Sequence, residues 1–191
     1  MEVHSDWLQA TSLRTPEGHP PPRECWHYWH TPPSGFLKCN SDAALFREES
    51  RAGMGAVIRD ENGNFLAARS YSFHGLPPVR DCEALGLLDA LEWVVESRLQ
   101  RVVFETDAKL VVDAINSSED DISEFGDIIA KCRAILDCHD FFSVQSVRRQ
   151  ANGLAHALAQ QTRFNPCLIS YSEVPIFLAP CVNNVWPLFN N

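Results

Sequence analysis

The stretch Phe36-Leu-Lys-Cys-Asn-Ser-Asp-Ala-Ala44 is the strand around which the rest of the chain can be ordered. Lys38, Asn40 and Asp42 alternate with apolar or small residues, and this period of two predicts a strand with two different faces. Asp42 falls near the far end of a strand that otherwise has the pattern of a buried one. Because an isolated buried carboxylate is costly, Asp42 must meet a cation, a metal ion or a hydrogen-bond network.

Two further carboxylates stand in similar settings. Glu83 lies early in an apolar helical run, and it shares a helix face with Leu87, Ala90 and Val94, so it is expected on the core side. Asp107 directly follows the apolar strand 101–106. Taken singly, Asp42 could cap a turn, Glu83 could be a solvated acid of the first helical turn, and Asp107 could cap a helix. Their joint order favours convergence at one site.

Hydrophobic periodicity and turn residues predict an α/β chain with the element order β-β-β-α-β-α-α-β-α. The expected strands are 36–44, 53–60, 64–73, 101–106 and 141–149, and the expected helices are 79–97, 109–115, 121–138 and 152–161. Asn62-Gly63 predicts a hairpin, and Asp121 with Glu124 has the form of a capping box. The helix 79–97 makes a crossover to strand 101–106, which we expect to be parallel.

Composition limits the function classes. Of the 191 residues, 45% are hydrophobic, which suits one domain with a core, and the net charge of −9 argues against a large basic surface for nucleic acid. We expect a disordered leader over 1–28, a domain over 29–163 and an extended tail over 164–191. A polar start and seven cysteines predict an intracellular protein, nuclear or cytoplasmic and not secreted, without a membrane span. The oligomeric state stays open.

The segment Cys25-Trp-His-Tyr-Trp-His30 could hold zinc, but it lacks a fourth ligand, so an aromatic anchor at the entry to the domain is favoured. The three carboxylates predict different chemistry. Converging acids repel one another unless divalent cations relieve the charge, and Mg²⁺ prefers oxygen ligands. Two such ions, about 3.5–4 Å apart, can activate water and stabilise the leaving oxygen of a phosphodiester.

Five motifs in this order resemble the ribonuclease H family, most closely the plant branch associated with retroelement reverse transcriptases. The motifs are Asn40-Ser-Asp-Ala-Ala44, Gly53-Met-Gly-Ala-Val-Ile-Arg-Asp-Glu-Asn-Gly63, Glu83-Ala84, Glu105-Thr-Asp107 and Arg149-Gln-Ala-Asn-Gly-Leu-Ala-His-Ala-Leu-Ala159. The likeness covers about 29–162. It implies a five-stranded mixed sheet of order 3-2-1-4-5 flanked by helices, and Mg²⁺-dependent (or Mn²⁺-dependent) cleavage of RNA in RNA–DNA hybrids.

The resemblance also assigns residues. Asp42, Glu83 and Asp107 match the first three family acids, and the fourth position falls on His156, where the family usually has an aspartate. We therefore expect these four residues as catalytic residues and metal ligands. The chain also has Ala43 where a glycine commonly follows the first acid. A neutral imidazole can ligate a metal, but His156 can equally be a histidine on a helix face without a catalytic part.

The expected substrate-binding residues are Asn40, Arg148, Arg149 and Asn152, each with an alternative. Asn40 either positions the substrate backbone or pairs within its own sheet. The two arginines either reach phosphates or neutralise the acids, and Asn152 is either a cap or a contact. Two functions follow. The first is a metal-dependent endoribonuclease with an RNA–DNA hybrid as its partner, and the second is a catalytically weak or inactive module that binds nucleic acid or protein.

Overall fold

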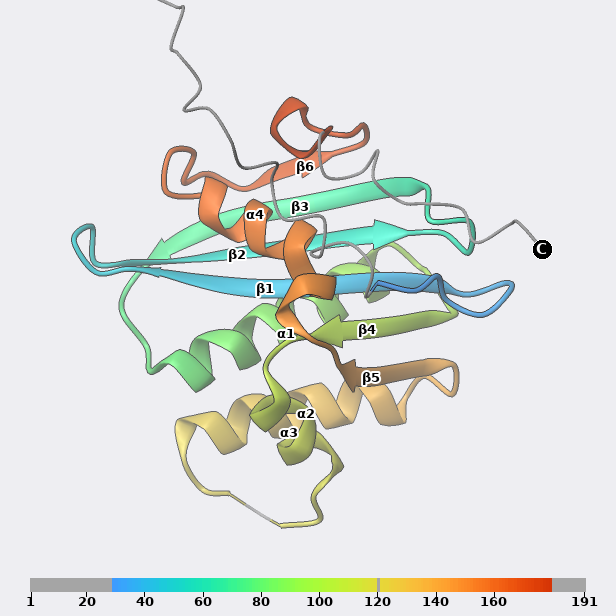
Figure 1. Ribbon diagram of the computed structural model, residues 1–191. Coiled ribbons are helices and arrows are strands. Elements are labelled where there is room, and N and C mark those ends of the chain that lie inside the picture. The colour runs from blue at the N-terminus through green and yellow to red at the C-terminus, as the bar shows by residue number, and fades with distance from the viewer. Residues whose placement is uncertain (1–28, 120, 180–191) are drawn as a thin grey trace, which may run out of the picture.

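The computed structural model describes residues 29–119 and 121–179, and the leader predicted over 1–28 lies outside them. Within this part of the chain a single mixed sheet is flanked by helices, as Figure 1 shows. The strands are β1 (Leu37–Phe46), β2 (Arg51–Arg59), β3 (Phe65–His74), β4 (Val102–Thr106), β5 (Phe142–Ser146) and β6 (Ile169–Tyr171). The helices are α1 (Val79–Glu96), α2 (Lys109–Asn116), α3 (Glu124–Asp137) and α4 (Gly153–Gln161), with 3₁₀ turns at Arg149–Asn152 and Ile176–Leu178.

The sheet has the order β5-β4-β1-β2-β3-β6. β1, β2 and β3 form an antiparallel meander, whereas β4 and β5 run parallel to β1. The predicted fold and the order 3-2-1-4-5 are therefore confirmed, with one strand more than expected. β6 is the additional strand, and its three residues pair with Ala68–Ser70 of β3. Three residues are too few to show a period, so no pattern of residues could have predicted this strand.

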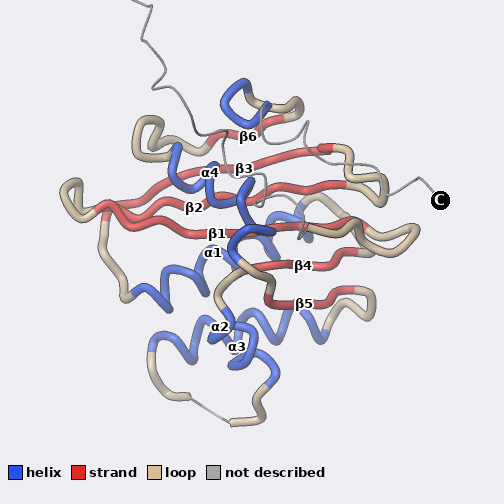
Figure 2. The backbone as a smooth tube through the Cα atoms, viewed as in Figure 1, coloured by secondary structure: helices blue, strands red, loops and turns tan. Residues whose placement is uncertain are grey.

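Helices cover both faces of this sheet, and Figure 2 shows α4 crossing the strands on one face. α1 packs on the opposite face, where α3 packs against it in turn. The largest core cluster lies between α1, α3 and the sheet and includes Cys39, Leu87, Leu91, Phe104 and Ile129. A second cluster under α4 joins Val57, Ala68, Leu154, Leu158 and Leu178. Cys39, Cys82 and Cys132 are buried.

Two glycines of β2 let α4 approach the sheet closely. A Cβ atom at Gly55 would lie 2.4 Å from the backbone nitrogen of Ala159 and 2.7 Å from the carbonyl oxygen of Ala155. At Gly53 it would lie 2.8 Å from the carbonyl oxygen of Ala159. Real Cβ atoms do not come this close to backbone, so β2 needs glycine here for the helix to sit where it does.

Element ends differ from expectation at two places. The N-cap of α3 is Ser123, whose hydroxyl accepts from the backbone N–H of Gly126, whereas the Asp121 carboxylate accepts from the N–H of Ser123. The predicted capping box is therefore wrong by two positions. β5 ends at Ser146, because the chain after it turns into the 3₁₀ segment Arg149–Asn152.

The described part of the tail, 164–179, packs against the domain. β6 extends the sheet, and the Leu178 side chain is fully buried under α4 with Val57 and Leu154. Among the residues that the structure describes, no helix has the length and apolar character needed to cross a membrane.

Candidate metal centre and its polar surroundings

The three carboxylates singled out by the sequence come together at one edge of the sheet. Asp42 lies on the central strand β1, Glu83 lies in the first part of α1, and Asp107 follows β4 directly. One ligand oxygen of each lies within 4.8 Å of those of the other two. Across the described ranges, no other set of three metal-ligating side chains is grouped in this way.

Burial and mutual repulsion raise the proton affinity of this cluster. Burial, together with the charges of Asp42 and Asp107, raises the pKa of Glu83 to about 8. Burial also raises the pKa of Asp42 to about 6, although a hydrogen bond from His156 opposes the shift. One oxygen of Glu83, Oε2, is buried and has no hydrogen-bond partner among the described residues. Such an uncompensated group of carboxylates favours a bound cation.

The alternatives considered for single acids do not apply to Asp42 and Asp107. Asp42 sits within a strand and its side chain is 1% exposed, so it caps no turn. The N-cap of α2 is Ala108, and no side chain caps that helix. The Asp107 carboxylate instead accepts hydrogen bonds from Arg149 Nη1 at 3.3 Å and from Asn152 Nδ2 at 3.1 Å.

His156 lies beside the three acids but is not one of the group. Its Nδ1 is 2.7 Å from Oδ2 of Asp42, and its Nε2 is 3.2 Å from Nη2 of Arg149. The same Nη2 lies 3.3 Å from Nδ1, so the guanidinium of Arg149 faces both ring nitrogens. The imidazole is a partner of Asp42 through Nδ1.

The residues expected to bind substrate divide into two pairs. Arg148 and Arg149 are exposed at the edge of the site, and Arg149 bridges Asp107 and His156. Asn40 and Asn152 have no exposed surface, and internal hydrogen bonds occupy both side chains. Direct contact with a substrate does not fit this burial. Asn152 occupies the N-cap position of α4, but its side chain makes no capping hydrogen bond there.

A buried polar network beside the acids is the part of the site that sequence reasoning missed. Glu105 accepts from Lys38 Nζ at 2.7 Å, from Gln145 Nε2 at 2.8 Å and from Asn40 Nδ2 at 2.9 Å. Arg59 donates to Oδ1 of Asn40 at 2.7 Å. Lys38, Arg59 and Glu105 are all at most 4% exposed, so they form a compensated ion cluster inside the protein.

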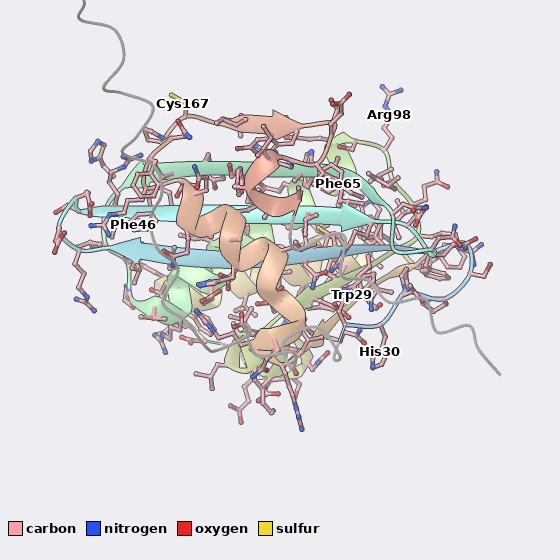
Figure 3. The ribbon with its side chains drawn as sticks, turned by 45° about the horizontal axis from the view of Figure 1, so that its top comes forward. Trp29, His30, Phe46, Phe65, Arg98 and Cys167 are labelled. Atoms are coloured by element: carbon pink, nitrogen blue, oxygen red, sulfur yellow. The ribbon has the colours of Figure 1, made fainter. Side chains whose placement is uncertain are left out.

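Trp29 covers this network, as the expected aromatic anchor would. Figure 3 shows it beside the first turn of α4, at the end of β1 opposite to Phe46. The guanidinium carbon of Arg59 lies 3.4 Å from the centre of the Trp29 ring, and Nε1 of Trp29 donates to Oδ1 of Asn40 at 3.2 Å. Lys38 and Glu105 stand in strands of otherwise apolar character, and that anomaly was the signal that could have revealed the network.

Comparison with known proteins relates this chain to one family. Residues 40–162 match the model of a family described as reverse transcriptase-like. A putative ribonuclease H protein of Arabidopsis thaliana is 27% identical over 131 residues, which make up 69% of this chain and 21% of that protein. The chain thus spans about a fifth of the length of this relative.

Solved structures share the fold. RNase H1 from the halophilic archaeon Halobacterium salinarum superposes with a TM-score of 0.62 at 22% identity, covering 69% of this chain and 99% of that one. LC11-RNase H1, solved in complex with an RNA/DNA hybrid, gives a TM-score of 0.57 at 22% identity, covering 65% of this chain and 94% of that one. The family match spans well over half of the chain, which therefore belongs to the reverse transcriptase-like family and contains an RNase H-like domain.

Proposed function

We propose that this protein is a nucleic-acid-binding, metal-dependent endoribonuclease that cleaves the RNA strand of RNA–DNA hybrids. The observation that carries the proposal is the convergence of Asp42, Glu83 and Asp107, whose ligand oxygens lie within 4.8 Å of one another although they come from three separate elements. The scaffold places three like charges together at an electrostatic cost, and a site that binds divalent cations explains why it does so.

The donor set fits Mg²⁺ or Mn²⁺. All three groups offer oxygen, the ligand type that Mg²⁺ prefers, and the buried Oε2 of Glu83 has no other partner among the described residues. Asp42, Glu83 and Asp107 would hold the ions, with His156 at the fourth position through Nε2 once it turns from Arg149. Divalent ions bound there supply charge neutralisation and lower the pKa of water for attack on a phosphodiester.

The protein's own groups have separate parts in the proposed reaction. The carboxylates determine where the substrate phosphate can lie, because a phosphate can approach these negative groups only through a cation bound between them. Arg149 is exposed and lies 3.3 Å from Asp107, so its guanidinium can turn from the carboxylate to a phosphate oxygen. The buried network around Asn40 and Glu105 keeps water away from the inner side of the acids.

An RNA–DNA hybrid is the proposed substrate because it presents phosphates to a local metal site and needs no broad basic surface. The net charge of −9 agrees with this limited form of attraction. The fold is shared with an RNase H1 that was solved in complex with an RNA/DNA hybrid. That relationship supports the substrate class for this chain.

The test is a cleavage assay on a labelled RNA–DNA hybrid with the full chain, in Mg²⁺ and in Mn²⁺. Asp107→Asn keeps the shape of the side chain but loses the charge needed for the metal, so nearly all cleavage should disappear while the fold persists. Asp113→Asn is the matched control, because Asp113 is an exposed aspartate of α2 that forms an ion pair with Lys109. Equal loss in both variants, or retained activity in Asp107→Asn, would contradict the proposal.

One observation favours a second function, a catalytically inactive module that binds nucleic acid. His156 and Arg149 already occupy Asp42 and Asp107, through contacts of 2.7 and 3.3 Å. If these contacts persist, the protein would bind a hybrid without cutting it. Calorimetry with Mg²⁺ and Mn²⁺ separates the two functions, because the enzyme requires metal binding that Asp42→Asn removes. Hybrid binding without metal binding would establish the module instead.

A further inference from the structure

Two buried amides connect the ion network to the acid cluster. Nδ2 of Asn40 donates to Oδ1 of Asn152 at 3.2 Å, and Nδ2 of Asn152 lies 3.1 Å from Oδ1 of Asp107 and 3.5 Å from Oδ1 of Asp42. Both asparagines have no exposed surface. A chain of hydrogen bonds thus runs from the buried Glu105 through both amides to the carboxylates of Asp42 and Asp107.

The orientation of the Asn40 amide is fixed by charged neighbours. Its Nδ2 donates to Oε2 of Glu105, which only accepts, and to Asn152. Its Oδ1 accepts from Nη2 of Arg59 and from Nε1 of Trp29, which only donate. A carboxamide has two donor hydrogens and two acceptor positions, so all four are used. The opposite orientation would place donor against donor and acceptor against acceptor.

The fixed Asn40 amide in turn fixes Asn152. Because Asn40 donates to its Oδ1, the Nδ2 group of Asn152 must point to the other side. There it meets only acceptors, which are the carbonyl oxygen of Ser41 at 2.8 Å and the carboxylates of Asp42 and Asp107. If the amide turned over, its oxygen would face two carboxylates and a carbonyl, and the cluster would spread.

The position of this link matters because the backbone pairing between β1 and β4 stops short of the acids. Their parallel register ends at the pair Asn40 and Glu105, two residues before Asp42 and Asp107. Beyond that pair β1 continues beside β2, and the Asn152 side chain connects the Ser41 carbonyl of β1 to Asp107, after the end of β4, in place of a backbone ladder.

We propose that Asn40 and Asn152 are positioning residues, with Asn40 setting the orientation of the Asn152 amide that holds Asp42 and Asp107 at the spacing a divalent cation needs. This inference rests on the proposed function for its consequence in catalysis. It differs from a purely structural role, because it predicts an effect on metal affinity that exceeds the effect of an equally destabilising change elsewhere. Partners that orient ligands typically change metal affinity or activity by about 10–100-fold when they are removed.

The experiment compares Asn40→Leu with Ile129→Ala in the full chain. Leucine removes the bond that orients Asn152 without touching Asp42, Glu83 or Asp107, although it also removes the contacts of Asn40 with Glu105 and Arg59. Ile129 is a buried core residue of α3. Three quantities are measured at temperatures where each variant is folded. They are kcat and KM on the labelled hybrid, the dissociation constants of Mg²⁺ and Mn²⁺ by calorimetry, and hydrogen exchange of the Asn152 side-chain amide by NMR.

For Asn40→Leu we expect kcat and metal affinity to fall by about 10–100-fold, KM to stay within about twofold, and the Asn152 amide to lose its protection. Ile129→Ala should lower the Tm and leave all three quantities near native values. Native kcat, metal affinity and amide protection in folded Asn40→Leu would overturn the inference. So would an equal loss in Ile129→Ala.

Failure of the proposed function can be told apart from failure of this inference. If the native protein does not cleave the hybrid, metal affinity and Asn152 protection still decide whether Asn40 orients the cluster. If the native protein binds no metal, amide protection decides alone, and unchanged protection in the variant overturns the inference. If Asn40→Leu does not fold, Asn152→Ala replaces it and should lower metal affinity while Lys38, Arg59 and Glu105 keep their contacts.

Discussion

Two groups of charged residues lie next to each other in this domain, joined by the amides of Asn40 and Asn152, and their charges are arranged in opposite ways. In the ion network, opposite charges are grouped: Glu105 accepts from three donors, Lys38 among them, and Arg59 donates to Asn40, although Nε of Arg59 has no partner among the described residues. In the acid cluster, Asp42, Glu83 and Asp107 face one another, and one Glu83 oxygen has no partner among the described residues. The ion network combines cations with an anion, whereas the acid cluster gathers three carboxylates, so the acid cluster is the group that a bound cation would complete.

The largest effect on stability is expected when Glu105, the carboxylate of the ion network, loses its charge. Glu105→Gln leaves Lys38 and Arg59 buried without their counter-charge and places an amide donor against Lys38 or Asn40. Breaking a buried ion pair from one side costs about 3–5 kcal/mol, so we expect a loss of that size in the free energy of unfolding. Urea denaturation measures it. A loss below about 1 kcal/mol would show that solvent already reaches the network.

The acid cluster should respond in the opposite sense. Burial holds the pKa of Glu83 at about 8, above its ordinary value near 4.5, so the folded protein binds a proton that the unfolded chain releases. Without metal, stability should therefore be greatest below pH 4.5 as far as Glu83 is concerned, and fall as the pH rises to about 8. Glu83→Gln should remove this fall and stabilise the metal-free protein at pH 8 by about 2 kcal/mol.

Thermal unfolding in EDTA between pH 5 and 8.5 tests the Glu83 prediction. Glu119→Gln is a matched control, because Glu119 is an exposed acid outside the cluster. Added Mg²⁺ should raise the Tm of the native protein and not that of Glu83→Gln. A native protein that gains stability toward pH 8 in EDTA would contradict the uncompensated character of the cluster.

A smaller effect is expected from substituting His156, which lies beside the acid cluster as the partner of Asp42. If His156 takes the fourth ligand position, His156→Asp should raise Mg²⁺ affinity and Mg²⁺-dependent cleavage about tenfold, because Mg²⁺ prefers oxygen. The native protein should then prefer Mn²⁺. Without metal the variant should be less stable, since a fourth carboxylate adds repulsion. Rates are compared on one hybrid in both metals, with the exposed His74→Asp as the control.

Equal rates with equal metal dependence in the native protein and His156→Asp would place His156 outside the metal site. It would then be a residue that only neutralises Asp42. Inactivity of both proteins would favour the binding module.

The smallest effect is expected at the exposed end of the compensated group. Gln145 is exposed and supplies one of the three donors to Glu105, so Gln145→Ala should cost only about 0.5–1 kcal/mol, because water can replace the lost donor. Urea denaturation beside Ser143→Ala, a neighbour on the same edge strand, gives the measurement. A cost as large as that of Glu105→Gln would show that the network depends on every donor.

The same contrast explains what the sequence could predict. Asp42, Glu83 and Asp107 each stand out locally, because a carboxylate interrupts an apolar pattern or ends it. The helices and strands that carry these acids have clear hydrophobic periods, so their order along the chain could be predicted, and the resemblance to the ribonuclease H family then implied the strand order of the sheet. The fit of the three to a metal could be argued from residue type alone.

The roles of Asn40 and Asn152 could not be predicted in this way. Both are polar, and a polar residue near a nuclease site suits a substrate contact as well as an internal bond. Their burial depends on Glu105, Arg59 and Trp29, which lie on different strands or before the first one and meet only in the folded sheet. β6 escaped detection for another reason, since it forms by pairing with β3 and not by a pattern of its own.

The strand β6 has a consequence for where this protein can be cut. It covers part of the β3 edge, and Leu178 after it fills the space between Val57, Leu154 and Leu158. A chain ended at 163 would bare backbone N–H and C=O groups of β3 together with an apolar hollow next to them. Exposed edges of this kind recruit further chains into sheets. We therefore expect proteolysis or truncation before 169 to increase self-association relative to the full chain, even though every acid of the metal centre lies upstream of the cut.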